Sequence, residues 1–276
     1  MSKVNDEVFD KIVAKLESGV IPWRKPWKGS APRNAKTNRP YNGINRILLS
    51  LTDYEDGRWA TFKQLQELGG NVKKGEKGTQ VVFWQMFTRE KDGKEETIPY
   101  AKFYTVFNIA QTEGIEWTTE GKTPECAIDE AELIWTNYDN RPSISFGGEI
   151  ACYSPVNDAI KMPPKSAFNN TEEYYCTLFH EAIHSTGHQT RLNREGITNP
   201  IHFGTETYSL EELIAELGAS FLCAESGINN TLDNSAAYIK GWLKALKDHP
   251  KALFTAASSA QKSFDWIKGN ATTANE

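Results

Sequence analysis

Residues 180–184 read His-Glu-Ala-Ile-His, and this stretch decides how the second half of the chain is interpreted. Apolar residues recur at helical spacing around it, from residue 174 to residue 183. Asn170 is the expected N-cap of this helix, and Gly187 is the expected stop. The sequence therefore predicts one helix that carries the whole motif.

Two histidines four positions apart share one face of a helix. The imidazoles of His180 and His184 can therefore reach a single ion at roughly 2.0–2.1 Å. Glu181, between them, is then expected to act as the general base toward the attacking water. No histidine stands where the metzincin pattern has its third, so the remaining protein ligand must come from elsewhere. The motif predicts a divalent metal ion, expected to be Zn²⁺.

A later segment, residues 208–216, offers two carboxylates at helical spacing. Glu212 and Glu216 are also four residues apart, and we expect Glu212 as third ligand with Glu216 bound to the free N–H of a ligand histidine. A second interpretation stays open. Ser209 and Glu212 also fit a capping box, which would engage Glu212 with the backbone and leave Glu216 for the metal.

The first half of the chain differs from the second in charge. The chain has 31 Lys and Arg against 36 Asp and Glu, a net charge of −5. Residues 1–120 hold 19 basic against 16 acidic residues, and residues 20–80 hold 12 against 5. A cationic first part joined to an anionic second part indicates that only the first contacts a polyanion.

Tryptophans alternate with cations in a proline-rich segment at residues 22–28, which read Pro-Trp-Arg-Lys-Pro-Trp-Lys. Indole rings offer flat surfaces for base stacking, while Lys and Arg neutralise phosphates. This chemistry suits single-stranded nucleic acid, although each tryptophan taken alone is more often a core residue. The candidate nucleic-acid-binding residues are Trp23, Arg24, Lys25, Trp27, Lys28, Arg33, Arg39, Tyr41, Arg46 and Trp59.

The remaining patterns predict an α+β protein of two domains. Helices are expected over residues 4–17, 44–51, 62–68 and 129–138, with Thr61 and Gln64 as a capping box. Strands over 79–87 and 102–108 are expected to form a long hairpin, and strands over 143–146 and 149–153 a short one turned at 147–148. A change to Thr, Gly and Glu near residue 118 predicts domains at 1–116 and 127–276, joined by a linker at 117–126.

The composition excludes several classes of protein. With 39% hydrophobic and 24% charged residues, the chain fits a globular protein rather than a collagenous, disordered or membrane-spanning one. No secretory signal pattern is present at residues 1–19, so a cytoplasmic protein with no membrane partner is expected. The four cysteines form no C-x-x-C pair and are expected to be reduced.

Both halves resemble the ArdC antirestriction family. The resemblance is carried in the first half by residues 21–27, 39–45, 59–62 and 74–78, and in the second half by residues 180–194 and 208–222. It implies an N-terminal single-stranded-DNA-binding domain, also found at the front of some plasmid primases. It further implies a mostly helical, zincin-like metallopeptidase domain with a small sheet and a glutamate as third metal ligand.

The resemblance implies a plasmid protein that protects conjugating DNA from host restriction. The expected partners are single-stranded DNA, with duplex DNA also open, and a protein substrate such as a restriction enzyme. Two alternatives stay open: a metal-dependent protease whose first domain recognises a protein, and a DNA-coating protein whose metal is purely structural.

Overall fold

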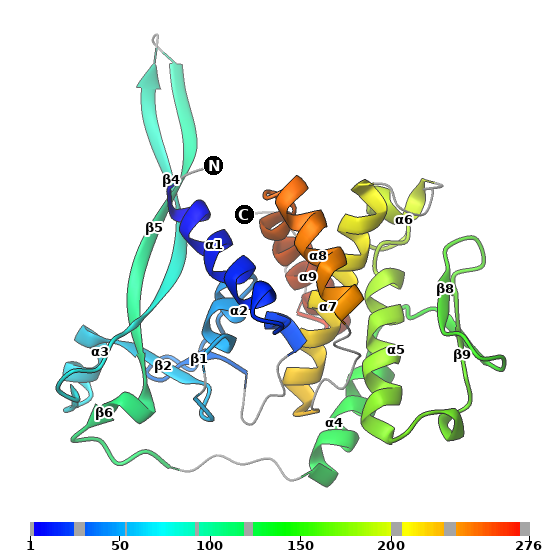
Figure 1. The fold of residues 1–276 in the computed structure, drawn as a ribbon, viewed down its shortest axis with the longest axis horizontal. Helices are drawn as coiled ribbons and strands as arrows, with labels where there is room; N and C mark the ends of the chain where they lie inside the picture. The colour runs from blue at the N-terminus through cyan, green and yellow to red at the C-terminus, as the bar shows by residue number, and fades with distance from the viewer. Residues whose placement is uncertain are drawn as a thin grey trace.

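The computed structural model describes residues 3–24, 31–52, 54–91, 94–118, 124–199, 206–228 and 236–270. The fold is α+β with two domains, as predicted. A long β-hairpin stands at one end of the molecule, helices occupy the middle, and a small sheet lies at the other end (Figure 1). No helix among these residues is long and apolar enough to cross a membrane.

The N-terminal domain is built on a four-stranded sheet of order β1-β2-β5-β4. β1 and β2 are parallel, and the other two pairs are antiparallel. The elements of this domain are α1 (Lys3–Glu17), η1 (Pro22–Arg24), β1 (Arg33–Asn34), α2 (Ile44–Ser50), β2 (Arg58–Thr61), α3 (Phe62–Glu67), β3 (Asn71–Val72), β4 (Thr79–Lys91), β5 (Lys94–Asn108), η2 (Ile109–Gln111) and β6 (Thr112–Glu113).

Most local predictions for this domain are confirmed. Thr61 caps α3 with the full capping box, because its hydroxyl accepts from the Gln64 N–H while the Gln64 side chain accepts from the Thr61 N–H. The hairpin is longer than predicted, since pairing continues without a break from Thr79–Val106 to Lys91–Lys94. The predicted turn at residues 92–93 lies outside the described residues.

The C-terminal domain consists of helices and one three-stranded sheet of order β7-β9-β8. Its elements are α4 (Pro124–Thr136), β7 (Ser143–Phe146), β8 (Cys152–Ser154), β9 (Ala159–Met162), η3 (Lys165–Ala167), α5 (Thr171–Ser185), α6 (Glu195–Thr198), α7 (Glu206–Ser226), α8 (Ala236–Asp248) and α9 (Ala252–Ile267).

The predicted short hairpin over residues 143–153 is wrong. β7 pairs in parallel with β9, and β8 pairs antiparallel with β9, so the central strand is one that the sequence analysis missed. Ile160 and Met162 of β9 are fully buried, which gives this strand the central place. Gly147 and Gly148 have positive φ and lead the chain out of the sheet instead of reversing it within two residues.

α5 and α7 pack closely because α7 carries a glycine at their contact. A Cβ built on Gly218 would lie 2.6 Å from Cδ1 of Ile183, closer than packed carbon atoms approach. Ile183 precedes His184 on α5, while Gly218 lies two residues beyond Glu216 on α7. The absent side chain therefore sets the distance between the two helices that carry the candidate metal ligands.

One continuous core joins the two domains. Buried residues of α1 and α2 belong to the same cluster as those of α7, α8 and α9. Trp23 of η1 packs edge-on against Trp242 of α8, with ring centroids 6.0 Å apart. The four cysteines form no disulfide, as predicted, and the buried sulfur atoms of Cys176 and Cys223 lie 3.2 Å apart. The exact domain boundaries stay a prediction, with α4 beginning inside the predicted linker.

Candidate functional site

The helix α5 carries the His-Glu-Ala-Ile-His motif near its C-terminal end. Asn170 caps the helix by accepting a hydrogen bond from the Glu173 N–H, as predicted. His180 and His184 lie on one face, with ring centroids 4.8 Å apart and planes at 80°. The predicted helix therefore delivers both imidazoles to one place.

Three side chains converge there. The Nε2 atoms of His180 and His184 are 3.1 Å apart. Glu212 of α7 places Oε2 3.5 Å from the first and Oε1 3.6 Å from the second. Two ligands at about 2.0–2.1 Å from a tetrahedral ion lie roughly 3.3–3.4 Å apart. This donor set of two imidazoles and one carboxylate therefore fits one divalent ion.

The two carboxylates that the sequence left open have different positions. Glu212 faces the Nε2 atoms of both histidines, whereas Oε1 of Glu216 lies 3.9 Å from Nδ1 of His180, on the other side of that ring. This distance is longer than a hydrogen bond. The alternative capping box of Ser209 and Glu212 is wrong, because α7 begins at Glu206 and Ser209 lies inside it. The geometry favours Glu212 over Glu216 as third ligand.

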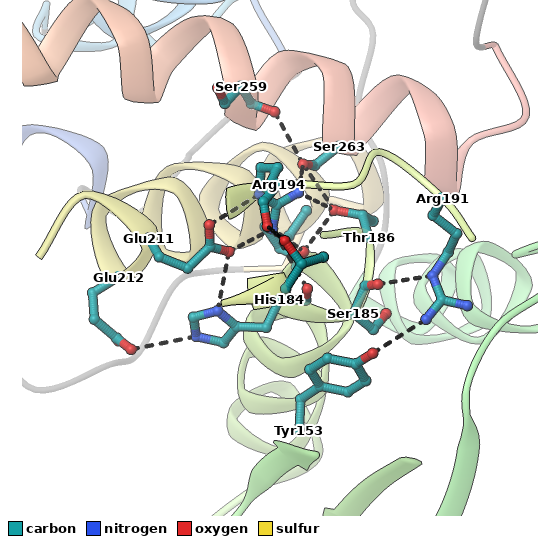
Figure 2. Close-up of polar contacts among 12 residues, drawn as sticks. Tyr153, His184, Ser185, Thr186, Arg191, Arg194, Glu211, Glu212, Ser259 and Ser263 are labelled. Carbon is teal, nitrogen blue, oxygen red and sulfur yellow. Dashed lines mark hydrogen bonds and ion pairs between the residues drawn. The ribbon is translucent and has the colours of Figure 1, made fainter. Parts of the chain in front are cut away.

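A buried ion pair that the sequence analysis missed supports His184. Glu211 Oε1 lies 3.4 Å from His184 Nδ1, and Glu211 also accepts hydrogen bonds from the Arg194 guanidinium (Figure 2). Burial raises the pKa of Glu211, but the hydrogen bonds from His184 and Arg194 outweigh it and lower the pKa. An ionised Glu211 holds the proton of His184 on Nδ1, which leaves Nε2 as the metal-binding atom.

Arg194 connects Glu211 of α7 to the end of α5 and to α9. Its Nη1 donates to Thr186 Oγ1 at 2.6 Å and to Ser263 Oγ of α9 at 2.9 Å (Figure 2). Its Nη2 donates to the Ile183 carbonyl at 2.9 Å. The signal in the sequence was two adjacent acids, Glu211 and Glu212, directly before the apolar run over residues 213–215. One of them had to face inward, and a buried carboxylate needs partners.

The electrostatics of the site favour a cation. Burial alone would lower the pKa of His180, but Glu212, Glu216 and Glu181 raise it to about 9. The side chains of His180 and His184 are 17% and 11% exposed, and that of Glu212 is 29% exposed. The site is therefore acidic, mostly buried and open on the side of Glu212.

Arg191, which follows the motif helix, has a structural role. It is buried, donates from Nε to the Ser185 carbonyl at 2.7 Å, and forms an ion pair with Asp158. Figure 2 shows its guanidinium on the far side of α5 from Glu212. This residue ties the β8–β9 turn to the end of α5.

The predicted nucleic-acid surface needs correction. Trp23, Trp59 and Arg46 are each 1% exposed, and Tyr41 is 8% exposed, so none of them presents a surface to a base or phosphate. Arg46 donates to the Phe221 carbonyl and lies between the rings of Phe221 and Phe264 at 4.9 and 4.8 Å. The physical reason is that large, largely apolar rings stabilise most when they are buried, whatever charges surround them in sequence.

The other candidate nucleic-acid-binding residues differ in exposure, and some lie outside the described residues. Arg39 is exposed and Arg33 partly so. The backbone of Arg24 is in η1, while Lys25, Trp27 and Lys28 lie outside the described residues. Exposed aromatic rings lie instead on the β4–β5 hairpin, where Phe83, Trp84 and Tyr100 are 46%, 50% and 58% exposed. Their signal in the sequence was the aromatic content of two predicted strands.

Two family models match the chain. The N-terminal domain of the anti-restriction factor ArdC matches residues 2–107, and a zincin-like metallopeptidase domain matches residues 130–259. The crystal structure of the metal-free antirestriction protein ArdC from plasmid R388 is similar, with a TM-score of 0.80 and 38% identity over 99% of this chain and 100% of that one. The Mn(II)-bound structure of the same protein has a TM-score of 0.77 over the same shares of both chains.

Curated relatives extend the comparison. Two Escherichia coli proteins named DNA primase TraC are 35% identical over 95% of this chain, which spans 20% and 27% of their length. An uncharacterised protein of Sinorhizobium fredii, y4eC, is 34% identical over 96% of this chain and 91% of its own. With both domains matched in order and a solved ArdC structure covered end to end, the chain belongs to the ArdC antirestriction family.

Proposed function

We propose that this protein binds single-stranded DNA through its N-terminal domain and hydrolyses peptide bonds at a metal centre in its zincin-like domain. The observation that carries the enzymatic half is the convergence of His180, His184 and Glu212 on one point. In this proposal the two activities together protect conjugating plasmid DNA from host restriction.

His180, His184 and Glu212 would hold the ion, with Zn²⁺ as our first candidate and Mn²⁺ as the second. The R388 protein has been solved with Mn(II) bound, and two imidazoles with one carboxylate also suit zinc. When bound, the ion would supply Lewis-acid polarisation of the scissile carbonyl. Glu211 keeps His184 oriented toward it, and Glu216 adds negative charge beside His180.

Glu181 is the chain's own proton acceptor in this proposal. Its side chain is 8% exposed and lies on α5 between the two histidines. A carboxylate held next to the reacting centre accepts a proton from the attacking water and returns it to the leaving amine. A DNA-bound protein such as a restriction enzyme is the substrate that best connects this chemistry with the first domain.

The proposal of single-stranded-DNA binding is supported by the basic charge of the N-terminal domain and by the similarity to the TraC proteins. Residues 20–80 carry 12 basic against 5 acidic residues. The TraC relatives are named as DNA primases, enzymes that act on DNA, and their matched part spans both domains of this chain. Binding to DNA through phosphates should weaken as salt rises.

One purified sample tests both halves. Elemental analysis should give one divalent ion per chain, and titration of a fluorescent oligodeoxythymidine should give salt-dependent binding. Absence of a tightly bound ion would contradict the metal centre, and absence of oligonucleotide binding at low salt would contradict the DNA-binding half.

The variant Glu181→Gln separates hydrolysis from the rest. It should keep the ion and the DNA affinity while abolishing proteolysis of a co-purified restriction enzyme and protection of incoming plasmid DNA. Glu172→Gln, on the first turn of the same helix, is the matched control and should retain both activities. Full protection by Glu181→Gln would remove hydrolysis from the mechanism and favour a DNA-coating protein with a structural metal.

A further inference from the structure

Among the tryptophans that the structure describes, Trp84 is the one with a largely exposed side chain. Its side chain lies 50% open to solvent, whereas Trp23, Trp59 and Trp242 are buried. Burying an indole stabilises a fold considerably, so Trp84 forgoes that stabilisation and keeps its flat ring open for stacking. Its environment then decides what it binds.

The backbone around Trp84 is held rigidly. β4 is the edge strand of its sheet, and the Asn45 side chain of α2 pairs with this edge. Asn45 Nδ2 donates to the Val82 carbonyl and Asn45 Oδ1 accepts from the Val82 N–H, both at 2.7 Å. Side chains two apart on a strand share a face, so Trp84 lies on the same face as buried Val82. The strand that carries the indole is therefore anchored before any partner arrives.

Trp84 forms one wall of a hollow of about 660 Å³ between the two domains, which we name the junction groove. Its size is within the range of ligand-binding pockets. The start of α2 and the strand β4 form one side, and α9 forms the other. The groove is lined by Asn42, Gly43, Ile44, Asn45, Val82, Trp84, Phe254, Thr255, Ser258, Ser259, Gln261 and Lys262.

The chemistry of this lining suits a nucleotide. Trp84 offers a flat ring for stacking, and the exposed Lys262 places a cation at the rim for a phosphate. Asn42, Thr255 and Ser258 add exposed polar groups that hydrogen-bond to sugar or base. No acidic side chain is among the described residues that line the groove, although the second half of the chain has an excess of acids.

We propose that one strand of nucleic acid passes through the junction groove with a base stacked on Trp84 and a phosphate at Lys262. This proposal rests on the proposed single-stranded-DNA binding and adds where the strand lies. A peptide is the weaker occupant, because the groove presents a lone half-open indole and a cation rather than a continuous apolar face or an open sheet edge. Its edge strand is already paired by Asn45 at Val82.

The test measures binding of a fluorescent oligodeoxythymidine to the full-length protein by anisotropy over a range of salt. Trp84→Ala should raise Kd on the order of tenfold, as expected for the loss of one stacked base, and Trp84→Phe should restore most of the affinity. Lys262→Gln should lower the slope of log Kd against log salt by about 0.7, the value for one phosphate contact to a single strand.

Two matched controls isolate the groove. Met86→Ala removes a side chain that is 70% exposed, on the same strand and face as Trp84, but outside the groove. Lys244→Gln removes a cation that is 81% exposed on α8. Both controls should bind the oligonucleotide like the unmodified protein, and circular dichroism should show all variants folded.

The outcomes separate the two proposals. If the unmodified protein binds the oligonucleotide and both Trp84→Ala and Lys262→Gln bind it equally well, the groove assignment is overturned while DNA binding stands. If the unmodified protein does not bind it at all, the proposed function fails first. If Trp84→Ala leaves oligonucleotide affinity intact but slows cleavage of fluorescent casein, the groove takes peptide and the nucleic-acid assignment is overturned.

Discussion

The metal centre and the predicted nucleic-acid surface were inferred from the same sequence, with different results. At the metal centre, residues chosen by their spacing on helices lie together, with 3.1 Å between the two imidazole nitrogens. In the N-terminal domain, residues chosen by composition are divided between the core, the surface and the undescribed part of the chain. Spacing on a helix is a geometric statement, whereas an aromatic and basic composition is not.

The tryptophans show why composition misled. An indole among prolines and cations can stack on a base or fill a core, and both uses need the same side chain. Trp23 fills a core, against Trp242, while Trp84 stays half open in a strand without a cluster of cations around it in sequence. Only packing distinguishes the two uses. The following variants test this contrast, from the largest expected effect to the smallest.

Trp23→Ala should lower the free energy of unfolding by about 3–5 kcal/mol, because it removes a large buried side chain from the core shared by both domains. Urea denaturation followed by circular dichroism measures the loss. Trp84→Ala is the control and should change stability by well under that amount. A folded, fully stable Trp23→Ala protein that no longer binds DNA would show that composition had been right after all.

Glu212→Gln should weaken metal binding more than the loss of a residue that only hydrogen-bonds to a metal ligand, which typically costs roughly 10–100-fold. The substitution removes the negative charge of Glu212 and replaces one of the two carboxylate oxygens that face the Nε2 atoms of the histidines. Competition with a chromophoric chelator measures the affinity. Glu216→Gln should have the smaller effect, and the opposite ranking would make Glu216 the third ligand.

Glu211→Gln should reduce metal affinity by about 10–100-fold, because Glu211 orients His184 through its Nδ1 atom and does not itself face the ion. The variant also leaves Arg194 without its carboxylate partner, so unfolding should be measured in parallel. Arg194→Lys keeps the charge and should retain more affinity than Glu211→Gln. Equal affinity of Glu211→Gln and the unmodified protein would mean that His184 is oriented by packing alone.

Gly218→Ala should cost about 1–3 kcal/mol of stability, because its Cβ would lie 2.6 Å from Ile183 Cδ1 and force α5 and α7 apart. Gly241→Ala in α8 is the matched control, since nothing lies within 4 Å of its added Cβ. It should raise stability by about 0.4–1 kcal/mol through the unfolded chain. A stabilised Gly218→Ala protein would show that α5 and α7 can accommodate the added methyl group without loss of packing.

Much of the local structure could be predicted from neighbouring residues. The capping box at Thr61, the N-cap at Asn170 and the first helix follow from interactions within one or two turns. The β7–β9–β8 sheet could not be predicted in the same way. Its central strand, Ala159–Met162, pairs with a strand that precedes it by more than ten residues, and local turn signals at Gly147 and Gly148 pointed to the wrong partner.

The candidate site was predictable to the extent that it lies on one helix. His180, Glu181 and His184 are fixed by the period of α5, and Glu212 and Glu216 by the period of α7. Which carboxylate faces the histidines depends on how α7 is rotated against α5. The role of Glu211 depends on Arg194, whose side chain reaches it from the segment after α5.

The sequence by itself determined the helix that carries the motif, the caps at Thr61 and Asn170, the spacing of the two histidines and the resemblance to ArdC proteins, because each depends on residues close along the chain or on a motif read in order. The tertiary structure alone decided that Glu212 faces both histidines, that Glu211 and Arg194 lie behind His184, and that Trp23 is buried while Trp84 is not. Burial and convergence depend on contacts between segments far apart in the chain, and a rotation of one helix or a shift of one strand changes them without changing any local pattern.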